Sequence, residues 1–349
     1  MNTHARKILL SSLLISPALA LAGELEQQML RCAVIGDASA RLGCFDALTK
    51  TAEAIIIATG KGVAESAAEV ALSVPAVASA EAAPPESPIS RTVQRWELDD
   101  NAKRGLFSFR PHRDNYMLLA NYSTASNDNP FRGFTPAGIK SQHVELTYQL
   151  SFKMKMAERA LSTPVDIWFG YTQQSFWQAY NRAASSPFRE TNYQPEVMAV
   201  LPIGKKFAGL DIQYLNFGLV HQSNGQTSTL SRSWNRLYAE LGVDHGNFAL
   251  AARLWQRLDN AKSNNDNIDI TDYLGHGDVR ATYRNHGHEF SLTARRNFKK
   301  RHGALQAGWA FPLSTNLKGY VQLFSGYGQS LIDYNYAQKS LGGGFLIDF

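Results

Sequence analysis

Three polar residues, His221, Ser223 and Asn235, are of the types that a nucleophilic hydrolase uses. A serine hydroxyl can attack an ester carbonyl when an imidazole removes its proton, and a third group must hold the imidazole in the right tautomer. Here Ser223 would be the nucleophile, His221 the base, and Asn235 the group that orients the ring. Because an amide adds no negative charge, it stabilises the imidazolium less than a carboxylate would. A bound cation beside the oxyanion is a reasonable candidate for the missing electrostatic help.

The spacing of these residues places them on one face of two neighbouring strands, because residues two apart in an extended strand share a face. The apolar residues on the same faces are Leu215, Phe217, Leu219, Leu237 and Leu241. If that apolar face meets lipid, polar groups on it are costly unless they have a purpose. The alternative is an ordinary interfacial polar pair, and the Gly-x-Ser-x-Gly elbow of soluble lipases is absent. Face, spacing and partner together favour catalysis on a membrane substrate.

The elements that must carry these residues are predicted to be β-strands. From about Asn115 onward, apolar and polar residues alternate in segments separated by turns rich in Asn, Asp, Gly and Ser. In 142–156, for example, every second residue is apolar: Val144, Leu146, Tyr148, Leu150, Phe152, Met154 and Met156. About twelve such segments of roughly ten residues are present, as expected for a transmembrane β-barrel with an apolar outside and a polar lumen.

The same alternation would allow a soluble β-sandwich whose apolar faces turn inward. Two observations favour the barrel. Whole strand faces carry Lys, Arg, Glu and Gln together, which suits a wet lumen. The last segment has Phe345, Ile347 and Phe349 on one face, a common ending in exported outer-membrane barrels. We therefore expect an all-β, antiparallel transmembrane barrel over residues 91–349, with a small α-helical module before it.

The N-terminal segment predicts export. Arg6 and Lys7 precede an apolar run from Ile8 to Leu21, and residues 20–22 read Ala-Leu-Ala, which suits signal peptidase. We expect a signal peptide over residues 1–22 and a mature start near Gly23. A membrane anchor is the alternative, but about fourteen apolar residues are too few to span a bilayer as a helix.

Residues 23–72 are rich in Ala with helical spacing, and we expect two short helices in a periplasmic module. This module contains Cys32 and Cys44, which in an oxidising compartment are expected to form a disulfide. A metal site is the weaker alternative, because few soft ligands lie nearby. Residues 73–90 consist of small residues and Pro, which is typical of a flexible linker.

The net charge and the absence of nucleotide-binding motifs narrow the possible partners. The formal net charge is +5, a modest basic excess that is compatible with an anionic membrane neighbour. The sequence contains no P-loop, no dinucleotide-binding fingerprint and no nucleic-acid module, so we expect no nucleic-acid partner.

At the three polar residues the sequence resembles the outer membrane phospholipase A family of Gram-negative bacteria. The matching words are HQSNG at 221–225, SRSWNRLY at 231–238, YTQQSFWQ at 171–178, SSPFRETNYQPE at 185–196, DNIDIT at 266–271 and SGYGQSLIDYN at 325–335. They cover roughly Asn115 to Phe349 and leave out the module with the two cysteines.

The resemblance implies a twelve-stranded outer-membrane barrel with phospholipase A1 and A2 activity, which also acts on lysophospholipids. The family's catalytic His, Ser and Asn match His221, Ser223 and Asn235. Members of the family depend on calcium and become active as homodimers. A polar residue of their dimer interface matches Gln173, which shares a strand face with Ile167, Phe169 and Tyr171. An ordinary interfacial Gln is the alternative.

The resemblance also implies a calcium site, with one Ca²⁺ for each active site of the dimer. Its ligands match the Ser231 side chain, the backbone carbonyl of Gln226 and a carbonyl at Ser185 of the partner subunit. The family often has Arg where this chain has Gln226, a change that a backbone ligand should tolerate. Asp266 matches a second calcium position of the family and follows insertions in this chain. Without the resemblance, Ser185, Gln226 and Asp266 would be ordinary loop residues.

Two other functions stay open at this stage. A porin-like or structural barrel without catalysis would conduct ions whether or not the Ser223 hydroxyl is present. A soluble secreted esterase would partition into water without detergent.

Overall fold

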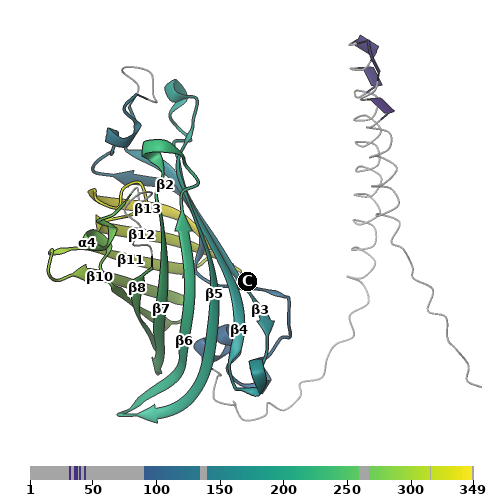
Figure 1. The fold of residues 1–349 in the computed structure, drawn as a ribbon, viewed down its shortest axis with the longest axis vertical. Helices are drawn as coiled ribbons and strands as arrows, with labels where there is room; N and C mark the ends of the chain where they lie inside the picture. The colour runs from purple at the N-terminus through teal and green to yellow at the C-terminus, as the bar shows by residue number, and fades with distance from the viewer. Residues whose placement is uncertain are drawn as a thin grey trace, which may run out of the picture. The chain divides into compact units, whose positions relative to one another are not determined.

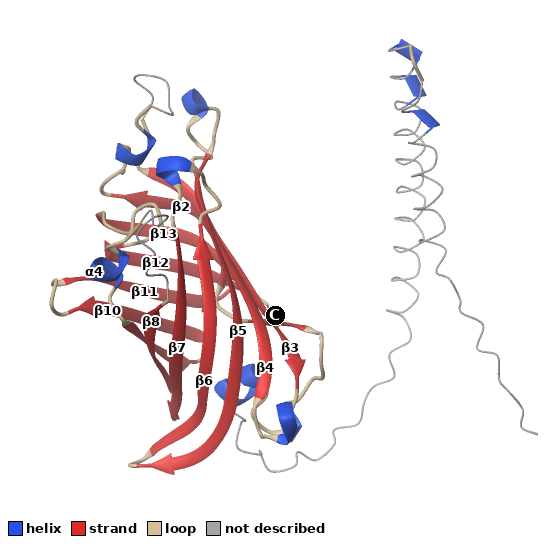
Figure 2. Ribbon diagram, in the orientation of Figure 1, coloured by secondary structure: helices blue, strands red, loops and turns tan. Residues whose placement is uncertain are grey.

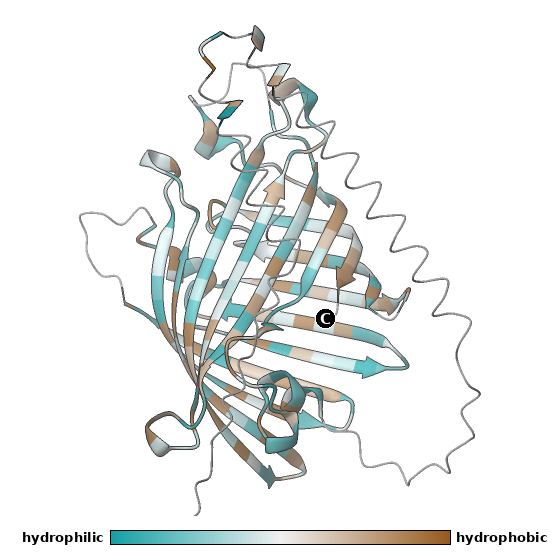
Figure 3. Cartoon of the chain, turned by 90° about the vertical axis from the view of Figure 1, so that its right-hand side faces the viewer, coloured by the Kyte–Doolittle hydropathy of each residue, from teal (hydrophilic) through white to brown (hydrophobic). Residues whose placement is uncertain are grey.

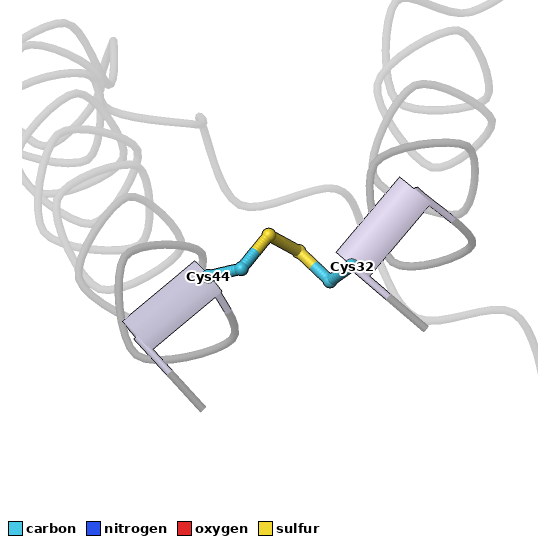
Figure 4. The surroundings of a disulfide bond; sticks show 2 residues. All are labelled: Cys32 and Cys44. Atoms are coloured by element: carbon cyan, nitrogen blue, oxygen red, sulfur yellow. A yellow bond between two sulfur atoms is a disulfide. The ribbon is translucent and has the colours of Figure 1, made fainter. Parts of the chain in front are cut away.

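The computed structural model describes residues 31–32, 35–37, 39–40, 43–44, 90–133, 140–258, 267–314 and 316–347. The chain divides into two units, residues 1–85 and 86–349. In the first unit a disulfide joins Cys32 to Cys44, whose Cα atoms are 5.6 Å apart (Figure 4). The predicted signal peptide, most of the predicted helical module and linker, Asp266 and Phe349 lie outside the described residues.

The second unit is a closed antiparallel β-barrel, as expected (Figures 1 and 2). Its strands in the described residues are β2 Asn115–Ser123, β3 Val144–Ala157, β4 Asp166–Trp177, β5 Phe188–Phe207, β6 Leu210–Ser223, β7 Ser233–His245, β8 Phe248–Arg257, β9 Gly277–Asn285, β10 His288–Asn297, β11 His302–Pro312, β12 Leu317–Tyr327 and β13 Ala337–Ile347. Each strand pairs with the next one, and β13 pairs with β2 to close the ring. A further short strand, β1 Phe109–Pro111, pairs with β3. Closure of a single sheet excludes the two-layer sandwich.

The apolar side of the strands faces outward. On β6 and β7 the outward side chains Phe217, Leu219 and Leu237 are each about half exposed, at 50%, 52% and 51%. Their inward neighbours Tyr214 and Asn216 are buried. Figure 3 shows this alternation of hydropathy along neighbouring strands. The predicted parity is therefore confirmed, with the polar face toward the lumen.

Among the helices in the described part of the chain, none is long and apolar enough to cross a membrane.

The two ends of the barrel differ in the length of their connections. At one end, two-residue turns join β5 to β6, β7 to β8 and β9 to β10, and Gly209, Gly246 and Gly287 adopt positive φ angles there. Positive φ angles are what tight hairpin turns require. At the other end the connections are longer, among them 224–232 and 328–336. His221 and Ser223 lie at the end of β6 that leads into a long connection.

The lumen contains a short helix that the sequence analysis missed, α3 Arg91–Trp96. Thr92 Oγ1 donates a hydrogen bond of 2.7 Å to Asp244 Oδ1 on β7. Trp96 packs edge-on against Trp168 of β4, with ring centroids 6.1 Å apart. Glu97, directly after the helix, forms ion pairs with Arg110 at 2.7 Å and Lys155 at 2.9 Å. Helix α3 therefore binds to inward side chains near the short-turn end.

Candidate active site

His221 and Asn235 are directly opposite each other in the β6–β7 ladder. The ring nitrogen Nδ1 of His221 donates a hydrogen bond of 2.8 Å to Oδ1 of Asn235. This bond selects one tautomer and leaves Nε2 as the ring nitrogen that can accept a proton. The His221 side chain is exposed and lies on the same outward face as Leu219. The pair that the strand parity predicted is therefore formed on the apolar wall.

Ser223 is the last residue of β6, on the same outward face as His221. Two steps along a strand separate the Cα atoms by about 7 Å, so the two side chains are neighbours. Its cross-strand neighbours are Ser233 on β7 and Tyr193 on β5. Tyr193 is 37% exposed and forms part of the outer wall beside the serine.

Gln222, between His221 and Ser223, points into the lumen. There it connects β6 to β7 on the face opposite the candidate catalytic residues. Its Oε1 accepts hydrogen bonds of 3.0 Å from Trp234 Nε1 and 3.0 Å from Arg236 Nη2. Trp234 and Arg236 flank Asn235 in the sequence and are buried. Side-chain bonds inside the barrel therefore hold β6 and β7 in register at the site. Sequence parity placed these residues inward, but it could not show that they bind one another.

The loop after Ser223, residues 224–232, carries two predicted calcium ligands, Gln226 and Ser231. The backbone N–H of Gln226 donates to Oδ1 of Asn224 at 3.3 Å. The backbone N–H of Ser231 donates to the carbonyl of Ser228 at 3.1 Å. Among the described residues, the Gln226 carbonyl and the Ser231 hydroxyl have no hydrogen-bond partner. Both oxygens belong to the loop that follows Ser223, and both are available to bind a cation.

The remaining predicted site residues lie elsewhere on the barrel. Ser185 is exposed and follows the short 3-10 helix η4 Arg182–Ala184 with a φ angle of 59°. Gln173 lies on the outward face of β4, where its Oε1 accepts a hydrogen bond of 3.0 Å from the Tyr171 hydroxyl. Gln173 thus has an intramolecular partner. In the part of the chain that the structure describes, no three His, Cys, Asp or Glu side chains gather as metal ligands.

The sequence and the barrel fold of this chain are similar to those of known phospholipases. The sequence model of the family described as Phospholipase A1 matches residues 92–347. A relative from Neisseria meningitidis serogroup B is 37% identical over an alignment of 378 residues, which takes in 100% of this chain and 97% of that protein. The outer membrane phospholipase A structure from Escherichia coli has a TM-score of 0.66 at 32% identity, covering 69% of this chain and 99% of that one.

A second solved structure is similar over nearly its whole length. It is the outer membrane phospholipase of Salmonella typhi, crystallised as a dimer with bound calcium. Its TM-score is 0.67 at 30% identity, and the match covers 73% of this chain and 97% of that chain. Because the family model spans the whole barrel and these relatives match it over most of their length, this chain belongs to the phospholipase A1 family.

Proposed function

We propose that this chain is a calcium-dependent phospholipase A1/A2 and lysophospholipase of the outer membrane. The observation that carries the proposal is the 2.8 Å bond between His221 Nδ1 and Asn235 Oδ1 on the apolar outer wall, beside Ser223. A nucleophile on that wall meets acyl esters in the surrounding lipid layer directly. Substrates would enter from the membrane plane and not through the lumen.

In the proposed reaction, the Ser223 hydroxyl attacks the ester carbonyl while His221 Nε2 takes its proton. The Asn235 amide accepts from Nδ1 of the ring, which leaves Nε2 as the nitrogen that takes this proton. His221 then donates the proton to the leaving alcohol, the lysophospholipid or glycerol oxygen. A water molecule, activated by the same imidazole, hydrolyses the acyl-enzyme and releases the fatty acid.

The residues beside Ser223 fit a calcium ion. Ca²⁺ binds oxygen ligands, and carbonyl and hydroxyl oxygens suit it better than they suit softer metals. The free oxygens of Gln226 and Ser231 supply two such ligands from one loop. When bound, the ion would supply positive charge near the oxyanion, which an Asn-based triad otherwise lacks. Asp266, the second predicted ligand position, stays a sequence-based proposal.

We also infer that the active form is a homodimer. Gln173 lies on the outward wall between the apolar Leu150 and Tyr193, its cross-strand neighbours. An amide in an apolar wall gains most when a second copy supplies a polar partner. The calcium-bound relative from Salmonella typhi is a dimer, which supports this arrangement. A carbonyl at Ser185 of the partner subunit would then complete the ion's ligands.

The test compares wild type with Ser223→Ala and with Ser325→Ala in mixed detergent–phospholipid micelles, with and without calcium chelation. Ser325 is an exposed, outward serine near the same end of β12, on a distant strand, and serves as the matched control. We expect fatty-acid release only with calcium, its loss in Ser223→Ala, and wild-type rates in Ser325→Ala. Equal release by wild type and Ser223→Ala would refute the assignment and favour a barrel without catalysis. Activity that survives chelation would remove calcium from the mechanism.

A further inference from the structure

Asn224, the residue after Ser223, is 2% exposed, and its side chain forms hydrogen bonds with four groups. Its Nδ2 donates to Glu190 Oε2 at 3.3 Å and to the carbonyl of Leu230 at 2.8 Å. Its Oδ1 accepts from the backbone N–H groups of Gln226 at 3.3 Å and Arg232 at 2.9 Å. A side-chain amide has two N–H donors and an oxygen with two lone pairs, so every bonding position of Asn224 is used.

Glu190 continues this network into the barrel from the neighbouring strand β5. Its Oε1 accepts from Asn192 Nδ2 at 2.7 Å and from the backbone N–H of Ile332 at 3.1 Å. Asn192 Oδ1 accepts from the backbone N–H of Leu331 at 2.9 Å. Asn192, Asn224 and Ile332 all donate to Glu190, so its carboxylate is an acceptor toward both loops.

The far end of the network is the loop between β12 and β13, residues 328–336. Its residues Leu331, Ile332 and Asp333 are exposed by only 2%, 1% and 0%, and Asp333 forms an ion pair of 2.8 Å with Arg189. This loop is therefore a buried and well-bonded support. Through Glu190 and Asn224, the loop beside Ser223 is connected to it.

We propose that Asn224 and Glu190 are positioning residues for the calcium site: they hold the Gln226 carbonyl and the Ser231 hydroxyl in place by bonding the 224–232 loop to the 328–336 loop. This inference rests on the proposed function. Without the network, the 224–232 loop would bind Ca²⁺ only after it was ordered, and ordering lowers the apparent affinity. Neither side chain is a ligand or a reacting group in this role.

The network can be tested by swapping the amide of Asn224 and the carboxylate of Glu190 between the two positions. Asn224→Asp places a carboxylate against the Glu190 carboxylate, and Glu190→Gln places an amide against the Asn224 amide. The double variant restores a donor facing an acceptor, because the Gln amide can donate to the Asp carboxylate. The matched control is Asn216→Asp, since Asn216 is a buried Asn on β6, the strand that precedes Asn224, and its amide donates to Tyr238 at 3.5 Å.

Three experiments are made: calcium binding by titration calorimetry with calcium chloride, steady-state kinetics in mixed micelles for kcat and KM, and amide hydrogen exchange of residues 224–232 in calcium-free protein. We expect each single variant to weaken calcium binding by about tenfold or more and to speed exchange in the loop. The KM for phospholipid and the behaviour of Asn216→Asp should stay at wild-type values. The double variant should bind calcium within about threefold of wild type, since only the bond to the Leu230 carbonyl stays broken.

Two outcomes would overturn the inference. One is wild-type calcium affinity and loop exchange in both single variants, and the other is a double variant in which the two losses multiply. Glu190→Gln replaces one carboxylate oxygen by an NH₂ group and keeps the shape of the side chain. This variant therefore provides the test if Asn224→Asp does not refold. Ser223→Ala, measured alongside, separates the two levels: full activity there refutes the proposed function, whereas loss there with unchanged Asn224 variants refutes only the positioning role.

Discussion

Gln173 and Ser223 lie in one row of the outer wall and are separated by a single residue, Tyr193. Tyr193 is the cross-strand neighbour of Gln173 on one side and of Ser223 on the other. Neighbouring strands are about 4.8 Å apart, so the proposed dimer contact and the proposed nucleophile are only about 10 Å apart. A second copy docked on Gln173 would therefore cover the wall right beside the serine. This proximity explains how dimerisation could complete the site.

Replacing Gln173 should weaken the dimer without harming the barrel. Gln173→Leu keeps an outward apolar wall but removes an amide that can bond to the partner, and such bonds in membranes contribute about 0.6 kcal/mol each. We expect dimerisation in detergent to weaken roughly threefold to tenfold for the two symmetric contacts. Sedimentation equilibrium with calcium measures it. Leu323→Ala, an exposed position on β12 at 52%, is the control. An unchanged dimer constant would contradict the interface.

Removing the Asn235 amide should reduce the rate far more than it reduces substrate binding. In Asn235→Ala the His221 ring loses its 2.8 Å bond and with it the preferred tautomer and orientation. We expect kcat to fall on the order of a hundredfold with KM nearly unchanged. Asn235→Asp can accept the same bond, so it should retain much more activity. Equal rates in the Ala and Asp variants would show that the amide does not orient the base.

Ser231→Ala should raise the calcium requirement. The substitution removes one of the two free oxygens on the 224–232 loop and leaves the backbone unchanged. We expect the calcium concentration for half-maximal activity to rise by about tenfold or more, and added calcium to restore most of the rate. Ser228→Ala, on the same exposed loop, is the control. The prediction is wrong if both variants show the wild-type calcium dependence.

Gly218→Ala should destabilise the barrel. Gly218 lies under the Tyr238 ring, and a Cβ atom there would be 2.2 Å from Tyr238 Cζ. Tyr238 cannot move freely because its hydroxyl donates to Glu196 Oε2 at 2.7 Å. Overpacking of this kind costs about 1–3 kcal/mol. Gly343→Ala is the control, because nothing lies within 4 Å of a Cβ atom there. Urea unfolding in detergent should separate the two variants.

Stability should depend on pH through His112, which lies in the connection between β1 and β2. Burial lowers the pKa of His112 from 6.5 to about 4, although the nearby Glu196 carboxylate acts in the opposite direction. The unfolded chain therefore binds a proton that the folded barrel does not, and the free energy of unfolding falls as the pH drops through this interval. Between these two pKa values, the free energy of unfolding should fall by about 3 kcal/mol.

Urea titrations at several pH values between these limits measure the effect. His112→Gln can still donate to Glu196 and should flatten the pH dependence. The control His286→Gln changes an exposed histidine in the β9–β10 turn and should leave the dependence intact. A wild-type pH profile in His112→Gln would contradict the assignment.

The outer wall of this protein could be predicted from the sequence because strand parity is a local rule. Residues two apart share a face, so the apolar set around Phe217 and Leu219 was enough to place His221, Ser223 and Asn235 together. The expected segment 142–156 became β3 Val144–Ala157, a shift of one or two residues at each end.

The interior could not be predicted in the same way. Parity points Asn224 and Glu190 inward, but an inward polar residue has the same pattern whether it meets water or a partner. Their bond links β5 to the loop after β6 across 34 positions, and Glu190 accepts from Ile332 across 142 positions. The bond to Ile332 joins strands that are far apart in the sequence order and forms only when the sheet has closed into a barrel. Helix α3 was missed because six residues are too few for a clear helical period.

The outward position of Ser223 determines which substrate concentration sets the reaction rate. A serine inside a pocket samples molecules per volume of solution, whereas a serine on the outer wall samples molecules per area of the surrounding layer. If Ser223 is the nucleophile, the governing quantity is the mole fraction of phospholipid in that layer. If phospholipid molecules moved from the inner leaflet to the outer leaflet, where Ser223 would meet them, the rate would change. The total amount of phospholipid would stay the same. The barrel would then report on membrane asymmetry by position alone.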